Sequence, residues 1–328
     1  MTSANYTSPG PSPLAFTVPG EYAGLRLDQA LAKLLPEYSR SRLQEWITQG
    51  WVTVGGAAAT ARQKVWGGEQ VQVAPQAHPS EQPHRAEAIG LDVVYEDHSL
   101  LVVNKPAGLV VHPGSGNWEG TMLNALLHHA PQLAEIPRAG IVHRLDKDTS
   151  GLLVVAKTLT AQTALVRQLQ ARSVHREYYA LVYGEVARDG TVDAPVGRHP
   201  TQRTKMATGS VVAAHGKQAV THYHVEERFP GCTLVRCKLE TGRTHQIRVH
   251  MASIRHPLVG DHTYLQGPQK CPPHMRAVLA AFPRQALHAA RLGLEHPESG
   301  AWMEWQASLP QDMQELLRAV RRAAEEAQ

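Results

Sequence analysis

Cysteine is scarce in this chain, which has 328 residues and three cysteines, Cys232, Cys237 and Cys271. An odd number of cysteines cannot form a complete set of disulfides, and their spacing lacks the paired Cys-x-x-Cys of a zinc site. Reduced thiols are typical of cytoplasmic proteins. We therefore expect a cytoplasmic protein that has no disulfide framework and no structural zinc.

Long apolar runs are also lacking. No apolar segment of the sequence approaches the roughly 20 residues that a membrane-spanning helix needs. The first ten residues, Met1–Gly10, contain neither the basic stretch nor the apolar stretch of a secretory signal. The sequence thus predicts a soluble protein that makes no contact with a membrane.

The common motifs for nucleotides and metals are missing as well. Neither G-x-x-x-x-G-K-[ST] nor G-x-G-x-x-G occurs, which argues against a nucleotide-driven or methyl-donor enzyme. Among the 19 histidines, His128-His129 and His222-x-His224 have ligand-like spacing, but no cysteine or carboxylate set accompanies them. The string Asp148–Gly151 is similar to the Asp-Thr-Gly of aspartic proteases, yet a serine interrupts it and no second copy exists. We predict no metal and no cofactor.

What the chain does have is enough apolar material for a sizeable core, with 42% hydrophobic residues. Its length fits roughly two domains. The 33 Lys and Arg residues against 29 Asp and Glu residues give a net charge of +4. This mildly basic balance is compatible with a polyanionic partner, and equally with an ordinary solvated surface.

Local patterns divide the chain into four segments. Residues 1–23 are predicted to be a disordered tail, because they are rich in Ser, Thr, Pro and Gly. Residues 24–74 form a small α+β module in which helical apolar spacing is followed by short strand-like pieces. The proline-containing segment 75–90 is predicted to be a linker. Residues 91–328 are expected to form one mixed, mostly antiparallel α+β domain.

Two helices are expected in the small module. In the first, Leu27, Ala30, Leu31 and Leu34 fall at helical spacing. The second begins at Ser39 or Ser41, either of which suits a helix cap, and it buries Leu43, Trp46 and Ile47. In the large domain, strands are expected at 91–95, 100–104, 152–156, 178–183, 222–226 and 234–239, and helices at 122–128, 160–170 and 311–326.

The segment Gly140–Gly151 is the most informative part of the sequence. Two apolar residues lead into a dense run of charged and polar residues, which ends in Ser-Gly before an apolar strand. Loops between rigid strands often carry function, although a solvated turn has a similar composition. Its string His143-Arg144-Leu145-Asp146-x-x-Thr149-Ser150-Gly151 resembles the catalytic signature of the RluA-type RNA pseudouridine synthases.

Further motifs of that family follow in order along the chain. They are Asn104–Pro113, Arg176–Ala180, Gly242–His250 and His256–Asp261, so that the resemblance covers about residues 91–310. The segments Arg198–Thr201 and Gly216–Tyr223 are similar to the members that act on 23S rRNA of the large ribosomal subunit. One departure is the stretch from Thr263 to Met275, which does not follow the family pattern.

The front module resembles an S4-type RNA-binding domain. The similarity lies in Arg26-Leu27-Asp28, Ser39–Arg42 and Gly50-x-Val52-x-Val54, although Gly55-Gly56 stands where Asn-Gly is common. Arg40 and Arg42 lie at the start of the second expected helix, where phosphate contacts are favourable. A role as ordinary surface charge is equally compatible with the sequence.

The resemblance implies the roles of three catalytic residues. Asp146 is the carboxylate that acts as nucleophile or electrostatic stabiliser, with attack at the sugar and attack at the base both open. Arg248 pairs with it and holds it ionised, the weaker alternative being a phosphate contact at the rim. Tyr178 offers an aromatic face to the target base, and its hydroxyl assists removal of the C5 proton.

Substrate-binding roles are expected for three further residues of the large domain. His143 and Arg144 precede Asp146 and either hold flanking phosphates or occupy the space that a flipped uridine leaves. Ile247 lies beneath the pocket, on a helix with Thr244 as its candidate cap, and Pro257 ends that run. Arg248 is expected to lie to one side of it.

The implied reaction isomerises uridine to pseudouridine in RNA. The expected partner is RNA, namely a stem-loop of 23S rRNA, either free or within a large-subunit assembly intermediate, and the protein is expected to act as a monomer. The rival from another class is a non-catalytic RNA-binding or ribosome-assembly protein that keeps the fold. Binding alone does not require Asp146, Tyr178 and Arg248 together, which favours the enzyme.

Overall fold

The computed structural model describes residues 13–76, 83–114, 116–202, 204–265, 267 and 270–326. Contacts between residues divide the chain into two compact units, one up to Pro83 and one from His84 onward. Each unit has its own hydrophobic core. Within the described ranges, no helix has both the length and the apolar character that a membrane span requires.

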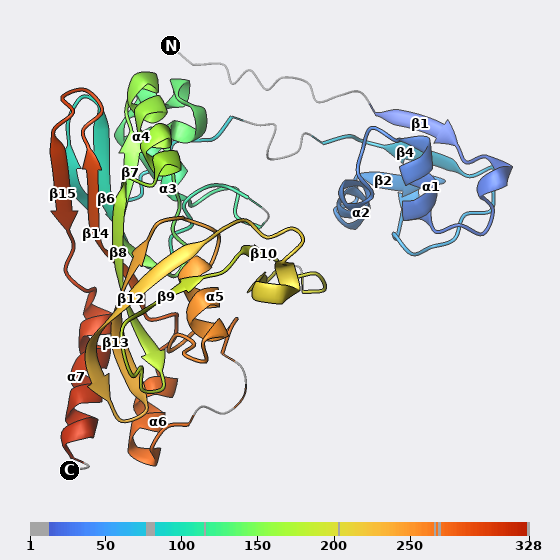
Figure 1. Ribbon diagram of the computed structural model, residues 1–328. Helices are drawn as coiled ribbons and strands as arrows, with labels where there is room; N and C mark the ends of the chain where they lie inside the picture. Colours follow the sequence, from blue (N-terminus) through green and yellow to red (C-terminus); the bar gives the residue numbers. More distant parts are fainter. Residues whose placement is uncertain are drawn as a thin grey trace. The chain divides into compact units, whose positions relative to one another are not determined.

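The smaller unit packs helices against a four-stranded antiparallel sheet with strand order β1-β4-β2-β3 (Figure 1). Its elements are β1 (Leu14–Thr17), the 3₁₀ helix η1 (Gly20–Tyr22), α1 (Leu27–Leu34), α2 (Arg40–Thr48), β2 (Val52–Val54), β3 (Ala57–Ala58) and β4 (Gln70–Val73). Both predicted helices are confirmed. Ser39 is the cap of α2, since its hydroxyl accepts the Arg42 backbone N–H at 3.3 Å.

The predicted disordered tail is wrong for its last part. Residues 1–12 lie outside the described residues, but Leu14–Thr17 form β1 and pair with β4. Leu14 and Phe16 alternate with exposed neighbours and pack against the core of the smaller unit. The abundance of Ser, Thr and Pro before them obscured this short period-two pattern.

The predicted linker, residues 75–90, includes residues 77–82, which lie outside the described residues. Gln76 belongs to the smaller unit, where its carbonyl accepts a hydrogen bond from Arg42 at 2.8 Å. Glu87 belongs to the larger unit, where its carboxylate accepts the Gly120 backbone N–H at 2.9 Å. The residues after 83 are therefore part of the larger unit.

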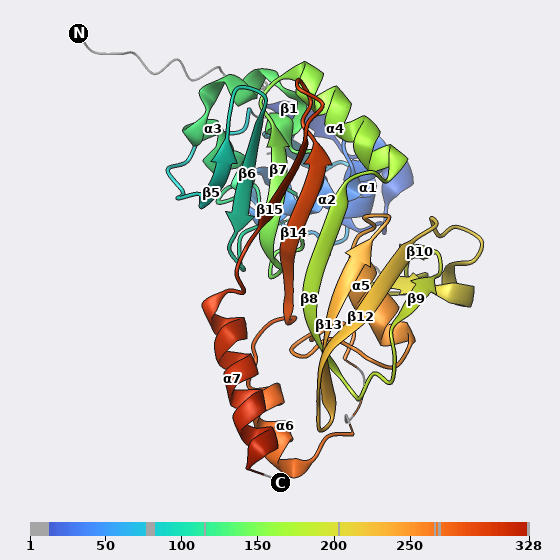
Figure 2. The same cartoon turned by 60° about the vertical axis from the view of Figure 1, so that its left-hand side comes forward.

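The larger unit is built on a nine-stranded sheet with the order β5-β6-β7-β14-β8-β13-β12-β9, and β15 pairs with β14 (Figure 2). The pairing is antiparallel except between β7 and β14, so the predicted fold class, a mixed and mostly antiparallel α+β domain, is confirmed. The strands of this sheet are β5 (Val93–Glu96), β6 (Leu100–Lys105), β7 (Ser150–Ala156), β8 (His175–Tyr183), β9 (Gly190–Asp193), β12 (Val220–Phe229), β13 (Cys232–Leu239), β14 (Leu287–Glu295) and β15 (Trp302–Gln306).

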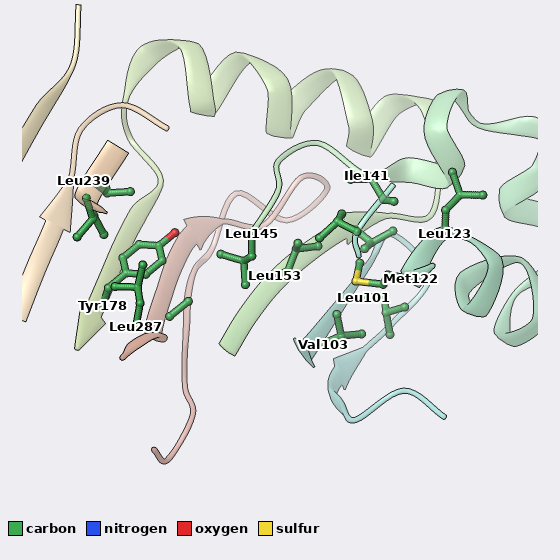
Figure 3. Packing of buried hydrophobic residues seen from close by; sticks show 14 of the residues in the cluster. Leu101, Val103, Met122, Leu123, Ile141, Leu145, Leu153, Tyr178, Leu239 and Leu287 are labelled. Carbon is green, nitrogen blue, oxygen red and sulfur yellow. The ribbon is translucent and has the colours of Figure 1, made fainter. Parts of the chain in front are cut away.

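Helices cover both faces of this sheet. They are α3 (Met122–His129), α4 (Leu159–Ala171), α5 (Gln246–Ser253), α6 (Pro273–Ala280) and α7 (Gln311–Glu325), with the 3₁₀ helices η3 (Pro131–Glu135), η4 (Pro137–Gly140) and η5 (Gly209–Val212). One face packs against α3 and α5, and Figure 3 shows the apolar residues of this core. The other face packs against α4 at one end and against α6 and α7 at the other. Strand alternation separates the faces: Leu101 and Leu153 belong to the first, Leu100 and Leu152 to the second.

Several elements were missing from the sequence prediction. They are β9, β14, β15, α6 and the two-stranded sheet of β10 (Val196–Arg198) and β11 (Met206–Thr208). The omission of β14 has a clear physical reason. This strand is buried on both faces and contains Ala289 and Ala290, so it shows neither alternation nor a run of β-branched residues.

Gly151 of the family signature allows β7 and β14 to approach each other. It pairs with Ala289, and its φ is +114°. A Cβ atom at this position would lie 2.2 Å from the Ala289 carbonyl oxygen. Because β7 is buried throughout, neither strand can move aside without disturbing the core.

We expect Gly151→Ala to lower the free energy of unfolding by more than about 3 kcal/mol in urea denaturation. The matched control is Gly300→Ala, where φ is +67° and no atom lies within 4 Å of the added Cβ. That change should cost only the ordinary left-handed penalty of about 1–2 kcal/mol. Equal losses for the two variants would show that the close strand approach is not what requires the glycine.

Candidate active site

Asp146 lies in the loop that connects η4 to β7, and buried groups fix this loop on one side. Lys105, at the end of β6, is 1% exposed. Its ammonium donates hydrogen bonds of 2.8–2.9 Å to three backbone carbonyls, those of Pro106, Leu109 and Lys147. Burial lowers the pKa of Lys105 to about 7, against the opposing charges of Asp148 and Asp146. One side chain thus ties the residue after Asp146 to the end of β6.

The other side of the loop is held from the segment that leads into β14. The Arg284 guanidinium donates to the Asp148 carbonyl at 2.9 Å and forms an ion pair with Asp312 at 2.6 Å. Gln285 donates to the Thr149 hydroxyl at 3.1 Å. The Ser150 hydroxyl lies 2.9 Å from His288 Nδ1. Thr149 and Ser150 of the signature therefore fix the loop through their contacts with Gln285 and His288.

Asp146 forms an ion pair with Arg248, as the sequence predicted. Its Oδ2 accepts a hydrogen bond from Arg248 Nη1 at 2.9 Å, although 102 residues separate the two in sequence. Arg248 lies on α5, and Ile247 and Met251 of that helix are buried. The predicted cap is wrong: the helix begins at Gln246 after His245, whose left-handed φ of 55° turns the chain, and Thr244 is not the cap. The helix ends at Ser253, before Pro257.

Asp261 holds the Arg248 guanidinium from the opposite side. Its two carboxylate oxygens accept from Nε at 2.7 Å and from Nη2 at 2.9 Å, and Nη2 also donates to Thr263 at 3.1 Å. Asp261 is 1% exposed and Arg248 6%. Burial alone would lower the pKa of Arg248, but the hydrogen bonds and charges of Asp261 and Asp146 raise it above its ordinary value. The guanidinium is a fixed cation shared by two carboxylates.

A histidine and a tyrosine complete the surroundings of the Asp146 carboxylate. His245 Nε2 lies 3.8 Å from Asp146 Oδ1, and His245 Nδ1 lies 2.8 Å from the Tyr264 hydroxyl. That hydroxyl accepts the Met206 backbone N–H at 2.9 Å, which leaves its own proton for Nδ1. Burial lowers the pKa of His245. The neutral ring then carries its proton on Nε2, the nitrogen that faces Asp146.

Asp146, His245 and Arg248 line a cavity of about 1170 Å³. All six site residues that the sequence predicted in the larger unit lie on its wall, namely Asp146, Tyr178, Arg248, His143, Arg144 and Ile247. Tyr178 is 6% exposed and packs among apolar side chains such as Leu239 and Leu287 (Figure 3). Burial raises its pKa. Within the described part of the chain its hydroxyl forms no hydrogen bond.

His143 has a contact with the backbone that the sequence did not predict. Its Nε2 accepts the Val154 backbone N–H at 3.1 Å, and burial, together with the nearby Arg176 charge, lowers its pKa to about 3. A neutral ring offers no positive charge to a phosphate. Arg144 is exposed at the cavity wall, so of these two residues Arg144 is the one that brings a positive charge to the cavity.

The two arginines predicted for the smaller unit are already engaged. Arg40 donates two hydrogen bonds, of 2.7 and 3.0 Å, to the buried carboxylate of Asp28. The Arg42 guanidinium lies over the rings of Tyr38 and Trp46, 5.3 and 5.1 Å from their centres, and also binds the Gln76 carbonyl. Both arginines therefore stabilise the fold of this unit. These contacts within the unit were not predicted from the sequence, which suggested phosphate contacts.

Asp261, His245, Tyr264 and Lys105 were not among the predicted site residues. Asp261 ends a recognised motif, but a single aspartate after a glycine carries no specific signal. His245 and Tyr264 come to lie near Asp146 only when α5 and the segment after it fold together. In the described residues, no group of three or more His, Cys, Asp or Glu side chains has the arrangement of a metal site.

Comparisons of sequence and structure match the chain to known proteins. The family described as RNA pseudouridylate synthase matches residues 99–253, and the S4 domain matches residues 25–71. The chain is 59% identical over 308 residues to the Ribosomal large subunit pseudouridine synthase D of Nitrosomonas europaea, covering 94% of this chain and 88% of the relative. It is 53% identical to the protein of that name in Escherichia coli K12, covering 95% and 96%. The solved structure of Human RNA Pseudouridylate Synthase Domain Containing 4 superposes with a TM-score of 0.57 at 27% identity, over 70% of this chain and 92% of the other.

Proposed function

The chain belongs to the RNA pseudouridine synthase family, and on that premise we propose that it isomerises uridine in 23S rRNA of the large ribosomal subunit, with Asp146 as the nucleophile. The observation that carries the proposal is the fixed Asp146–Arg248–Asp261 arrangement, in which Asp146 and Arg248 lie on the wall of a large cavity. The choice of substrate rests on relatives whose names place them on the large ribosomal subunit and which match nearly the whole chain.

The chemistry requires one reactive carboxylate and no external group. The bond between ribose C1′ and N1 of the base breaks, the base turns, C1′ bonds to C5, and the C5 proton leaves while N1 gains one. Atoms and electrons balance within the nucleotide. Asp146 attacks at the sugar or at the base, and both routes regenerate its carboxylate at the end.

Each neighbour of Asp146 has a distinct part in this proposal. Arg248 holds the carboxylate in a fixed orientation, because Asp261 fixes the guanidinium. Tyr178 stacks against the flipped base, and its unpaired hydroxyl takes part in removal of the C5 proton. Ile247 forms the apolar wall beneath the base. Arg144 enters the space that the uridine leaves.

The proposed target is a uridine in the loop of an RNA stem-loop, either in free RNA or within a large-subunit assembly intermediate. The protein is proposed to act as a monomer in the cytoplasm. Flipping a base out of a duplex costs about a few kcal/mol. Bases in a loop are already partly unstacked, so flipping them costs less. The smaller unit, which matches the S4 domain and is called the S4 unit below, is proposed to bind the A-form stem through the shape and the sugar-phosphate backbone of the RNA.

The direct test compares pseudouridine positions in rRNA from cells with and without the gene, followed by rescue. We expect one or more 23S positions to vanish in the knockout, to return with the wild-type gene, and to stay absent with Asp146→Asn. If every 23S position persisted while transfer RNA positions vanished, the substrate assignment would be wrong although the reaction class survived.

Removal of the S4 unit gives a further expected result. Deleting residues 1–75 should weaken RNA binding and flatten the slope of log affinity against log salt concentration, since fewer phosphates are neutralised. The larger unit has its own cores and should still turn over saturating RNA. The measurement is filter binding at several salt concentrations, alongside turnover. An unchanged slope would mean that the S4 unit makes no ionic contact with RNA.

A further inference from the structure

Positive charge dominates the wall of the cavity. Among the described residues that line it, the carboxylates are Asp146 and Glu240, and the cations are Lys147 and seven arginines: Arg138, Arg144, Arg172, Arg176, Arg198, Arg243 and Arg248. Arg248 is held by Asp146 and Asp261. Arg172 forms an ion pair with Glu240 at 3.1 Å. Arg176 differs from both of these, because it is buried and no carboxylate of the described residues pairs with it.

Arg176 lies on β8, two residues before Tyr178, and is 6% exposed. Its Nη2 donates to the Glu240 carbonyl at 3.3 Å, while its Nε is buried and has no acceptor among the residues that the structure describes. It forms no ion pair within the described part of the chain. The Glu240 carboxylate does not pair with Arg176, since it binds Arg172 at 3.1 Å and His222 at 2.8 Å.

A charge in this situation is costly. Burial lowers the pKa of Arg176, yet a guanidinium keeps its proton in proteins. An uncompensated buried charge costs folding free energy, and an N–H without an acceptor adds to that cost. An anion bound next to Arg176 would offset this cost. Because Arg176 lines the cavity, an anion can approach it through the cavity.

His143 offers a second donor beside Arg176. Its Nε2 accepts the Val154 N–H, so the neutral ring carries its proton on Nδ1. Both residues line the same cavity, and burial together with the Arg176 charge lowers the pKa of His143. Neither has an acceptor on Nε of the arginine or Nδ1 of the histidine among the described residues.

We propose that Arg176 binds a phosphodiester group of the substrate RNA next to the uridine that is isomerised, an inference that rests on the proposed function. Successive residues on one face of a strand lie about 7 Å apart. Arg176 and Tyr178 occupy two such neighbouring positions on the wall of one cavity. When the base stacks on Tyr178, the backbone beside it reaches Arg176, which identifies this arginine as a positioning residue for the flipped nucleotide.

The experiment uses the full-length protein and a stem-loop around a uridine located by the rRNA mapping. A series of these RNAs carries one uncharged methylphosphonate at each position flanking that uridine. We expect one position to raise KM of the wild type by about 10- to 100-fold, as for the loss of a charged hydrogen bond. Arg176→Gln should raise KM for the normal RNA by a similar factor, and the same methylphosphonate should then have no further effect.

Arg172→Gln is the matched control, because Arg172 lies on the same wall but already has Glu240 as its partner. It should leave the methylphosphonate effect at that position in place. Additive effects of Arg176→Gln and every methylphosphonate would overturn the proposal. So would a wild type that tolerates all methylphosphonates, a result that does not depend on whether the variant folds.

Binding measurements separate this inference from the proposed function. The same coupling should appear in RNA affinity when it is measured in an Asp146→Asn background, where no turnover is expected. Arg176→Lys keeps a positive charge and should retain part of the methylphosphonate effect. If the wild type turns over the stem-loop and no coupling to Arg176 exists, only the phosphate site is wrong.

Discussion

Asp146→Asn is expected to lower the rate of pseudouridine formation by at least about 10³-fold, the scale seen when an enzyme loses its nucleophile. The substitution is nearly isosteric, and the loop that carries Asp146 is fixed by Lys105 and Arg284. RNA affinity and the free energy of unfolding should therefore stay close to those of the wild type. Tritium release from C5-labelled RNA measures the rate, and filter binding measures the affinity.

Asp148→Asn is the matched control, since Asp148 lies in the same loop and Arg284 contacts only its backbone carbonyl. It should retain most of the activity. Residual activity of Asp146→Asn above a few per cent of the wild type would exclude Asp146 as the essential group.

Asp261→Asn is expected to have the second largest effect. It removes the bidentate carboxylate that fixes Arg248, and breaking a buried ion pair costs about 3–5 kcal/mol of stability. Arg248 then has Asp146 as its remaining carboxylate and loses its fixed orientation. A misplaced catalytic group costs about 10²-fold in rate, so kcat should fall by that order while KM changes little.

The surface pair of Asp189 and His224 supplies the control for Asp261→Asn. Asp189 is exposed, and Asp189→Asn should leave both the stability and kcat close to those of the wild type. Thermal unfolding and single-turnover rates should be measured on the same preparations. If Asp261→Asn kept the wild-type kcat, the orientation of Arg248 would not depend on Asp261.

The sequence allowed the outline of both units to be predicted, because most of their elements obey simple periodicities. α1 and α2 show helical apolar spacing, and Ser39 marks the start of α2. β14 escaped prediction because burial on both faces removes alternation. The strand β1 escaped because a short period-two pattern follows a stretch of tail-like composition. Local patterns fail where tertiary contacts alone decide the structure.

The candidate site was predictable only in part. Asp146 and Arg248 were paired through resemblance, since a contact across 102 residues leaves no trace in local spacing. Asp261, which fixes Arg248, and Asp28, which binds Arg40, are both buried aspartates, and single charged residues give no sign of burial in a sequence. Burial would raise the pKa of Asp28, but the hydrogen bonds that Gln44, Arg40 and Arg26 donate to its carboxylate lower it.

Release of tritium from 23S rRNA labelled at uridine C5 tests the central claim most directly, because formation of pseudouridine replaces that hydrogen. The purified full-length protein should release tritium in proportion to time and enzyme, without added cofactor, and Asp146→Asn should release none above background. Tight binding of the labelled RNA by the wild type without any tritium release would contradict the account, and would identify the protein as an RNA-binding relative that keeps the fold.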